Sequence, residues 1–132
     1  MPAPVIDAVG VTSRDMARTL AFYRRLGFDF PEPGPEDQHI EAITAPGAVR
    51  LMIDAEALAT SLIGAPPRPS NHAVFALLCE SPAELDRIAA TLAEAGDEIV
   101  TPPFDAFWGQ RYATVADPDG YRIDLFAALS AG

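Results

Sequence analysis

Few side chains in this sequence could perform chemistry at neutral pH. Among its 132 residues are two histidines, one cysteine and no lysine. Acid–base catalysis relies mainly on His, Cys, Lys and activated carboxylates, and lysine Schiff-base chemistry is excluded. Cys79 lies late in an apolar run, which is typical of a small core residue. No phosphate loop, nucleophile elbow or useful carboxylate pair is present. We predict no catalytic residue, with an Asp or Glu of shifted pKa as the open alternative.

A group of aromatic side chains instead favours binding. Trp108 is the single tryptophan and lies in a segment flanked by Pro and Gly, together with Phe104 and Phe107, and Tyr112 follows closely. Clustered rings in a loop favour a stacking platform for a planar or cationic ligand. The alternative is a tryptophan buried in the core. We predict that these four residues bind a ligand.

Polar residues earlier in the chain form a second candidate group. His39 could hydrogen-bond a ligand carbonyl or quinone oxygen, and Asp54 and Glu41 could accept from a ligand ammonium or carbamate group. The alternative is that all three are solvated strand residues. Met52 and Ile53 point to opposite faces of one strand, so only one can line a cavity. We predict Met52 as the adaptable apolar wall.

The elements that must position these side chains form two similar halves. The first is predicted to contain a strand, a helix capped by Ser13 and ended by Gly27, and then strands, at residues 5–12, 13–27, 39–44 and 48–54. The second is predicted to contain a strand, a helix with a capping box at Ser81 and Glu84, and further strands, at residues 72–79, 81–96, 98–100, 111–116 and 121–127. The segment 101–109 is predicted to be a long loop.

This pattern predicts an α+β fold of two tandem βαβββ modules. Neither half buries enough surface alone, so paired sheets should curl into a cup-like mixed sheet around an apolar cavity. We expect one domain over residues 1–132, with module one at about 4–64, a Pro-rich linker at about 65–70 and module two at about 71–128.

Composition excludes several classes of partner. Apolar residues make up 49% of the chain, which is enough for one core, yet no apolar run is long enough to span a bilayer. The net charge of −10 makes nucleic acid a poor partner. A single cysteine forms no internal disulfide. We expect a cytoplasmic protein that binds neither membrane nor nucleic acid.

Two segments carry a family resemblance. MARTLAFYRRLGF at 16–28 and ADPDGYRIDLF at 116–126 resemble the first-helix signature and the closing hairpin of the vicinal oxygen chelate superfamily. That superfamily contains glyoxalase I, extradiol dioxygenases, fosfomycin-inactivating enzymes and bleomycin-binding resistance proteins. The resemblance implies the two-module fold, and a homodimer in which both subunits shape each pocket.

A narrower resemblance concerns the aromatic segment. FWGQRYA at 107–113 with DPDG at 117–120 is similar to the mitomycin-binding branch of drug-sequestering resistance proteins, as are 39–43 and 50–54. It implies that Trp108 stacks on the ring system of a drug.

The superfamily's enzymes hold a divalent metal with His and Glu side chains from four strands. By resemblance, these positions fall on Ala8, on Leu51 or Met52, on His72 and on Asp124. At most two can ligate, so we expect no metal and no cofactor. We predict that His72 bonds loop backbone, and that Asp124 bonds backbone donors or an Arg.

Together these observations predict a metal-independent, antibiotic-sequestering protein. Its ligand would be an aromatic, DNA-damaging natural product such as a mitomycin- or bleomycin-like drug, held by stacking and hydrogen bonds. The alternative is a metal-dependent enzyme of the glyoxalase or dioxygenase type.

Overall fold

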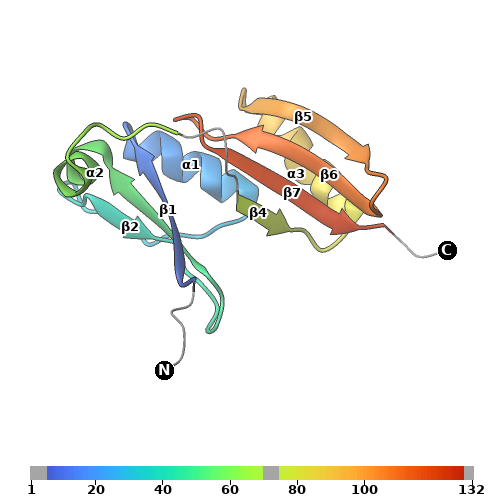
Figure 1. The fold of residues 1–132 in the computed structure, drawn as a ribbon, viewed down its shortest axis with the longest axis horizontal. Coiled ribbons are helices and arrows are strands. Elements are labelled where there is room, and N and C mark those ends of the chain that lie inside the picture. The colour runs from blue at the N-terminus through green and yellow to red at the C-terminus, as the bar shows by residue number, and fades with distance from the viewer. Residues whose placement is uncertain (1–5, 70–74, 130–132) are drawn as a thin grey trace.

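The computed structural model describes residues 6–69 and 75–129, so the predicted strand start at His72 lies outside the described residues. The first half of the chain contains β1 (Ala8–Ser13), α1 (Met16–Leu26), β2 (His39–Glu41), β3 (Arg50–Ala55) and α2 (Glu56–Ile63). The second half contains β4 (Phe75–Leu78), α3 (Pro82–Glu94), β5 (Glu98–Asp105), β6 (Gln110–Ala116) and β7 (Arg122–Ala128). Figure 1 shows the two halves lying end to end.

The helices begin and end at specific capping residues. In α1 the cap is Asp15, whose carboxylate accepts a hydrogen bond from the Arg18 backbone N–H at 3.2 Å. The predicted cap, Ser13, is instead the last residue of β1, and its hydroxyl bonds Thr19. Gly27 ends the helix with a φ of 117°, which a residue with a Cβ rarely adopts.

The predicted N-cap of α3 is confirmed at Ser81, while the Glu84 carboxylate, the other half of the predicted capping box, binds Arg87 instead. The Ser81 hydroxyl accepts from the Glu84 backbone N–H at 3.1 Å, and Pro82 occupies the first turn. A backbone N–H in the first turn of a helix has no acceptor within the helix. Proline, which lacks this N–H, therefore loses no hydrogen bond there.

The strands form two mixed sheets. The first has the order β1-β3-β2, and the second has the order β4-β7-β6-β5. In each sheet the first strand of the half pairs in parallel with its last strand, β1 with β3 and β4 with β7. The other pairings are antiparallel. The α+β class and the glyoxalase-like arrangement are therefore confirmed.

Module one differs from the prediction in one strand. By pairing, β3 corresponds to β7 and β2 to β6, so the described residues of module one contain no counterpart of β5. The Pro-rich segment 27–38 takes its place, because proline lacks the N–H that a strand ladder needs. The helix α2, which we did not predict, follows β3 directly.

The predicted loop over 101–109 is also corrected. The strand β5 continues to Asp105, so Phe104 is a strand residue and only a short turn joins β5 to β6. Pro102 and Pro103 are accommodated because β5 is an edge strand and its register with β6 shifts twice along its length. These shifts bring Phe104 opposite Tyr112.

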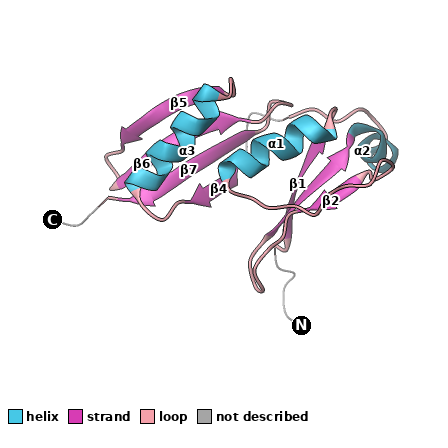
Figure 2. Cartoon of the chain, turned by 180° about the vertical axis from the view of Figure 1, so that it is seen from behind, coloured by secondary structure: helices cyan, strands magenta, loops and turns pink. Residues whose placement is uncertain are grey.

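Helices α1 and α3 cover one side of the two sheets, as Figure 2 shows. One hydrophobic cluster runs beneath them and contains residues of both halves. Phe22 and Tyr23 are completely buried in it, so both side chains anchor α1 in the core. We call the side of each sheet turned away from α1 and α3 the open face.

Side-chain bonds also tie the halves together. The Tyr23 hydroxyl donates to Asp117 at 2.7 Å, and the Arg25 guanidinium binds Asp97 through two hydrogen bonds at 2.8 and 2.9 Å. At the neighbouring corner, Arg14 pairs with Asp119 at 3.0 Å.

Candidate functional site

Four aromatic rings gather on the open face of the second sheet and form what we call the aromatic platform: Phe104, Phe107, Trp108 and Tyr112. The Trp108 ring lies 5.0 Å from Phe107, 5.3 Å from Tyr112 and 6.2 Å from Phe104, centroid to centroid, each in an edge-to-face arrangement. Trp108 is 49% exposed and Phe107 is 98% exposed. The prediction that these residues cluster is therefore confirmed, and Trp108 is not a core residue.

The turn between β5 and β6 holds the indole in place. The Ala106 N–H donates to the Gln110 carbonyl at 2.8 Å, and Gly109 takes a φ of 88°, which closes the turn. The Trp108 Nε1–H donates to the Gln110 side-chain carbonyl at 2.8 Å. This bond satisfies the only polar atom of the indole, so the exposed half of the ring is available for apolar contact.

A carboxylate adjoins the aromatic platform. Asp124 on β7 is 8% exposed and accepts hydrogen bonds from the Thr114 hydroxyl at 2.7 Å and from the Tyr112 hydroxyl. We predicted backbone donors or an arginine, so this prediction was wrong. Residue 124 lies directly opposite 114 in the register of β6 and β7, which places the hydroxyl within reach.

The open face of the first sheet carries the polar candidates. The His39 imidazole bonds Asp54 through Nδ1 at 2.5 Å and Glu41 through Nε2 at 2.8 Å. The Glu41 carboxylate also binds the Arg50 guanidinium, which reaches Asp7 at 2.7 Å. The hydrogen bond to Glu41 is the main cause of a raised pKa of His39, and the hydrogen bond to Asp54 adds to it. Both ring nitrogens of His39 are thus engaged within the protein.

Met52 lies on this same open face. Met52 packs beside Gly10 of β1, where an added Cβ would lie 3.7 Å from the Met52 Cε. The neighbouring Ile53 is fully buried on the helix side of the sheet. The prediction that these two residues face opposite sides is confirmed.

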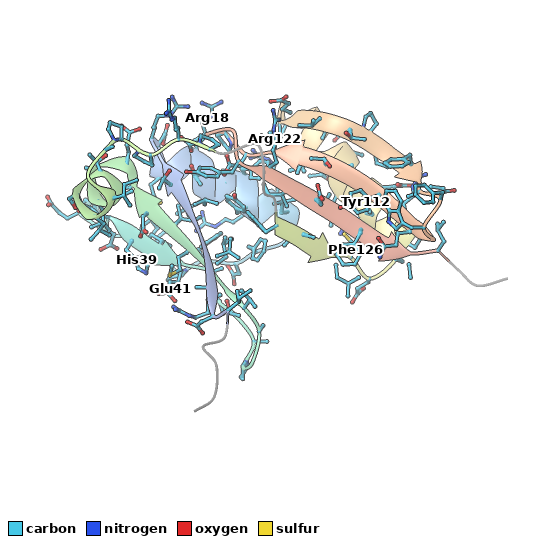
Figure 3. All side chains as sticks on the ribbon, viewed as in Figure 1. Arg18, His39, Glu41, Tyr112, Arg122 and Phe126 are labelled. Carbon is cyan, nitrogen blue, oxygen red and sulfur yellow. The ribbon has the colours of Figure 1, made fainter. Side chains whose placement is uncertain are left out.

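The two candidate groups do not meet within one chain. Figure 3 shows His39 and Glu41 on the first sheet, far from Tyr112 and Phe126 on the second. The structure thus brings His39, Asp54 and Met52 together on one sheet and the aromatic platform together on the other. Gln110 and Thr114, which anchor the platform, were missed by sequence reasoning. The alternation of Thr114 with the apolar Ala113 and Val115 could have placed it on the open face of β6, whereas no sequence signal marks Gln110.

The structure places a cavity elsewhere. A groove of about 670 Å³ lies between β1, β4, the end of α1 and the start of α3, with Val9, Phe28 and Phe75 among its apolar lining residues. Cys79 also lines it, and burial raises the pKa of that thiol. This groove contains none of the predicted site residues.

At the described positions of the predicted ligand set, the residues do not fit the superfamily's metal. Ala8 carries no donor, and Leu51 is buried on the helix side. Met52 faces the open side with a thioether, a poor ligand for a hard divalent ion. Both Asp124 oxygens accept hydroxyl hydrogen bonds. Across residues 6–69 and 75–129, no three His, Cys, Asp or Glu side chains come together as a metal site.

The comparisons with known proteins agree with the fold. The family model of the Glyoxalase/Bleomycin resistance protein/Dioxygenase superfamily matches residues 5–125. The chain therefore belongs to this superfamily. A search of curated proteins gave no match. No helix within the described ranges is long and apolar enough to cross a membrane.

Solved structures show the same architecture. A glyoxalase/bleomycin resistance protein/dioxygenase from Nocardioides is 26% identical with a TM-score of 0.73, covering 100% of this chain and 88% of that one. A glyoxalase-related enzyme from Fulvimarina pelagi is 18% identical with a TM-score of 0.80, covering 95% and 88%. A lactoylglutathione lyase from Agrobacterium tumefaciens is 14% identical with a TM-score of 0.67, covering 96% of each chain. The last two likenesses concern the fold alone.

Proposed function

We propose that this protein sequesters an aromatic, DNA-damaging natural product, such as a mitomycin- or bleomycin-like drug, and thereby confers resistance without a metal. The observation that carries the proposal is the aromatic platform, in which a half-exposed Trp108 is surrounded by three further rings. Binding alone lowers the concentration of free drug.

The exposure of these rings supports a binding role. A side chain as apolar and as exposed as Phe107 gains from contact with an apolar ligand, at about 25 cal/mol per Å² of surface removed from water. Rings add stacking energy and lose little conformational freedom on binding, since they have only two side-chain torsions. The platform therefore suits a flat, rigid ligand.

The scarcity of free acid–base groups supports binding over catalysis. His39 has carboxylate partners on both ring nitrogens, and Cys79 is buried with a raised pKa. A thiol with a raised pKa is less often a thiolate at neutral pH, and the thiolate is the nucleophile. Neither residue adjoins the aromatic platform.

We further propose that the working form is a homodimer. The His39 group and the aromatic platform both lie on open faces, at distant places in one chain. A second copy would bring the first sheet of one protomer over the second sheet of the other. Each pocket would then combine Trp108 from one protomer with Met52, Asp54 and His39 of its partner.

Calorimetric titration with mitomycin C and with bleomycin tests the proposal. We expect saturable binding of at least one drug and at least a tenfold loss of affinity in Trp108→Ala, which corresponds to about 1.4 kcal/mol. Leu62→Ala is the matched control, because Leu62 is an exposed apolar residue on α2 outside the platform. Its affinity should equal that of the unchanged protein.

Two results would contradict the proposal. If neither drug binds, or if Trp108→Ala binds as tightly as the unchanged protein, the aromatic platform does not bind such a drug. Tightly bound Zn, Ni, Mn or Fe in the purified protein, with activity lost on chelation, would establish the metal-dependent enzyme instead.

A further inference from the structure

A buried carboxylate, Asp124, lies beside the aromatic platform. Its carboxylate is almost fully buried, and among the described residues its hydrogen-bond partners are the hydroxyls of Tyr112 and Thr114. None of the ion pairs formed within the described part of the chain includes Asp124. A buried carboxylate without a cation is unfavourable, and each of its oxygens can accept more than one hydrogen bond.

Tyr112 connects this charge to the rings. Its hydroxyl donates to Asp124, while its ring lies 5.3 Å from Trp108 and 6.3 Å from Phe104. The hydrogen bond to Asp124, together with burial, raises the pKa of Tyr112 to about 12. The phenol therefore remains a neutral donor at physiological pH, and the negative charge lies at the edge of the platform.

The strand register extends this arrangement across the sheet. Phe104, Tyr112 and Phe126 are neighbours on β5, β6 and β7, so they form an aromatic row on the open face. The next row contains Thr114 and Asp124. Figure 3 shows Tyr112 and Phe126 beside each other on the sheet. A ligand lying on the row would thus have a carboxylate along one edge.

Two further forces select for positive charge. Aromatic faces attract cations through their quadrupoles. The net charge of −10 adds a negative field around the whole protein, which raises the local concentration of cations.

We propose that the ligand of the aromatic platform is a planar aromatic cation, whose ring stacks on Trp108 and whose positive charge lies toward Asp124. This inference rests on the proposed function, because it names the class of ligand that the same site takes. It separates this platform from one that selects ligands by shape alone.

Acridine and N-methylacridinium provide the test, because they share one fused ring system and differ in a fixed positive charge. Both would be titrated by calorimetry at mildly alkaline pH and low ionic strength, where acridine is neutral. We expect the unchanged protein to bind N-methylacridinium about tenfold more tightly than acridine, a ratio typical of a desolvated cation on aromatic rings.

Substitution of the carboxylate isolates its contribution. In Asp124→Asn, which keeps the shape and an acceptor oxygen, the preference for the cation should fall to about twofold or less, with acridine binding unchanged. Asp105→Asn is the matched control: it removes the same charge from the exposed end of β5, where Asp105 pairs with Arg111. It should retain the tenfold preference. If Asp124→Asn fails to fold, Asp124→Ser replaces it with the same expected loss of preference, because its hydroxyl can still bond the hydroxyls of Tyr112 and Thr114.

The outcomes distinguish this inference from the proposed function. Equal binding of both probes to the unchanged protein, or a preference that survives in Asp124→Asn, would overturn the inference and leave a neutral stacking site. If neither probe nor either drug binds, the proposed function itself fails.

Discussion

At the residue scale, His39 is the clearest titrating group on the first sheet. Its carboxylate partners, Glu41 and Asp54, raise its pKa above the ordinary value of about 6.5. Because the pKa of His39 is raised in the folded state, the pairing of His39 with Glu41 and Asp54 stabilises the fold. This stabilisation is fully present below the ordinary pKa and is lost as the pH rises through the folded-state pKa.

An NMR titration of the imidazole protons tests this sign. We expect the His39 signals, assigned from their disappearance in His39→Gln, to titrate above the ordinary histidine range. In Asp54→Asn the midpoint should move down, toward that range. A midpoint at or below the ordinary value in the unchanged protein would show that the two carboxylates do not hold the proton.

A second prediction at this scale concerns the bond between Tyr23 and Asp117. Tyr23→Phe removes the hydroxyl donor from a buried carboxylate, so we expect a loss of about 2 kcal/mol in unfolding free energy. Tyr121→Phe breaks a half-buried bond to Thr12, a neutral partner, and should lose only about 1 kcal/mol. Urea unfolding measures both variants, and an equal or reversed order would contradict the account.

At the element scale, we expect the N-cap of α1 at Asp15 to stabilise the protein. Asp15→Ala removes the side chain that accepts from the first turn and should destabilise the protein by about 1 kcal/mol. Glu94→Ala, at the exposed end of α3, is the control. It removes a negative charge that is unfavourable at a helix C-terminus, so its effect on stability should be close to zero or slightly stabilising. Thermal unfolding followed by circular dichroism compares the two, and a neutral Asp15→Ala would assign the cap elsewhere.

The elements show which features a sequence can predict. Both long helices could be predicted because their apolar residues recur with the helical period, and the α3 cap because Ser81 and Glu84 have the spacing of a capping box. The helix α2 was missed since its eight residues, Glu56–Ile63, give a weak period. The course of β5 was missed because Pro102 and Pro103 indicate a loop, while an edge strand with register shifts tolerates them.

At the scale of the whole molecule, the two halves should unfold together. They share one hydrophobic cluster and the bonds from Tyr23 and Arg25 to the second half. Trp108 reports on the second module by fluorescence, and the His39 NMR signals report on the first. We expect coincident transitions in urea, and separate midpoints would show that the modules are independent.

The placement of the site also belongs to this scale. The sequence predicted the clustering of Trp108 with its three aromatic neighbours, because they are close along the chain. It did not predict that His39 and the aromatic platform lie on separate sheets, far apart in one chain. The distance between them depends on how the two sheets are arranged, and local patterns carry no information on that arrangement.

The most direct test of the proposed function is the fluorescence of Trp108 during titration with mitomycin C and with bleomycin. Because the chain contains a single tryptophan, the signal comes from the platform alone. We expect quenching by at least one drug that saturates at one drug molecule per chain, with a matching shift in the emission maximum as the ring is covered. Emission that stays unchanged with both drugs, or that falls linearly without saturation with both, would contradict this proposal.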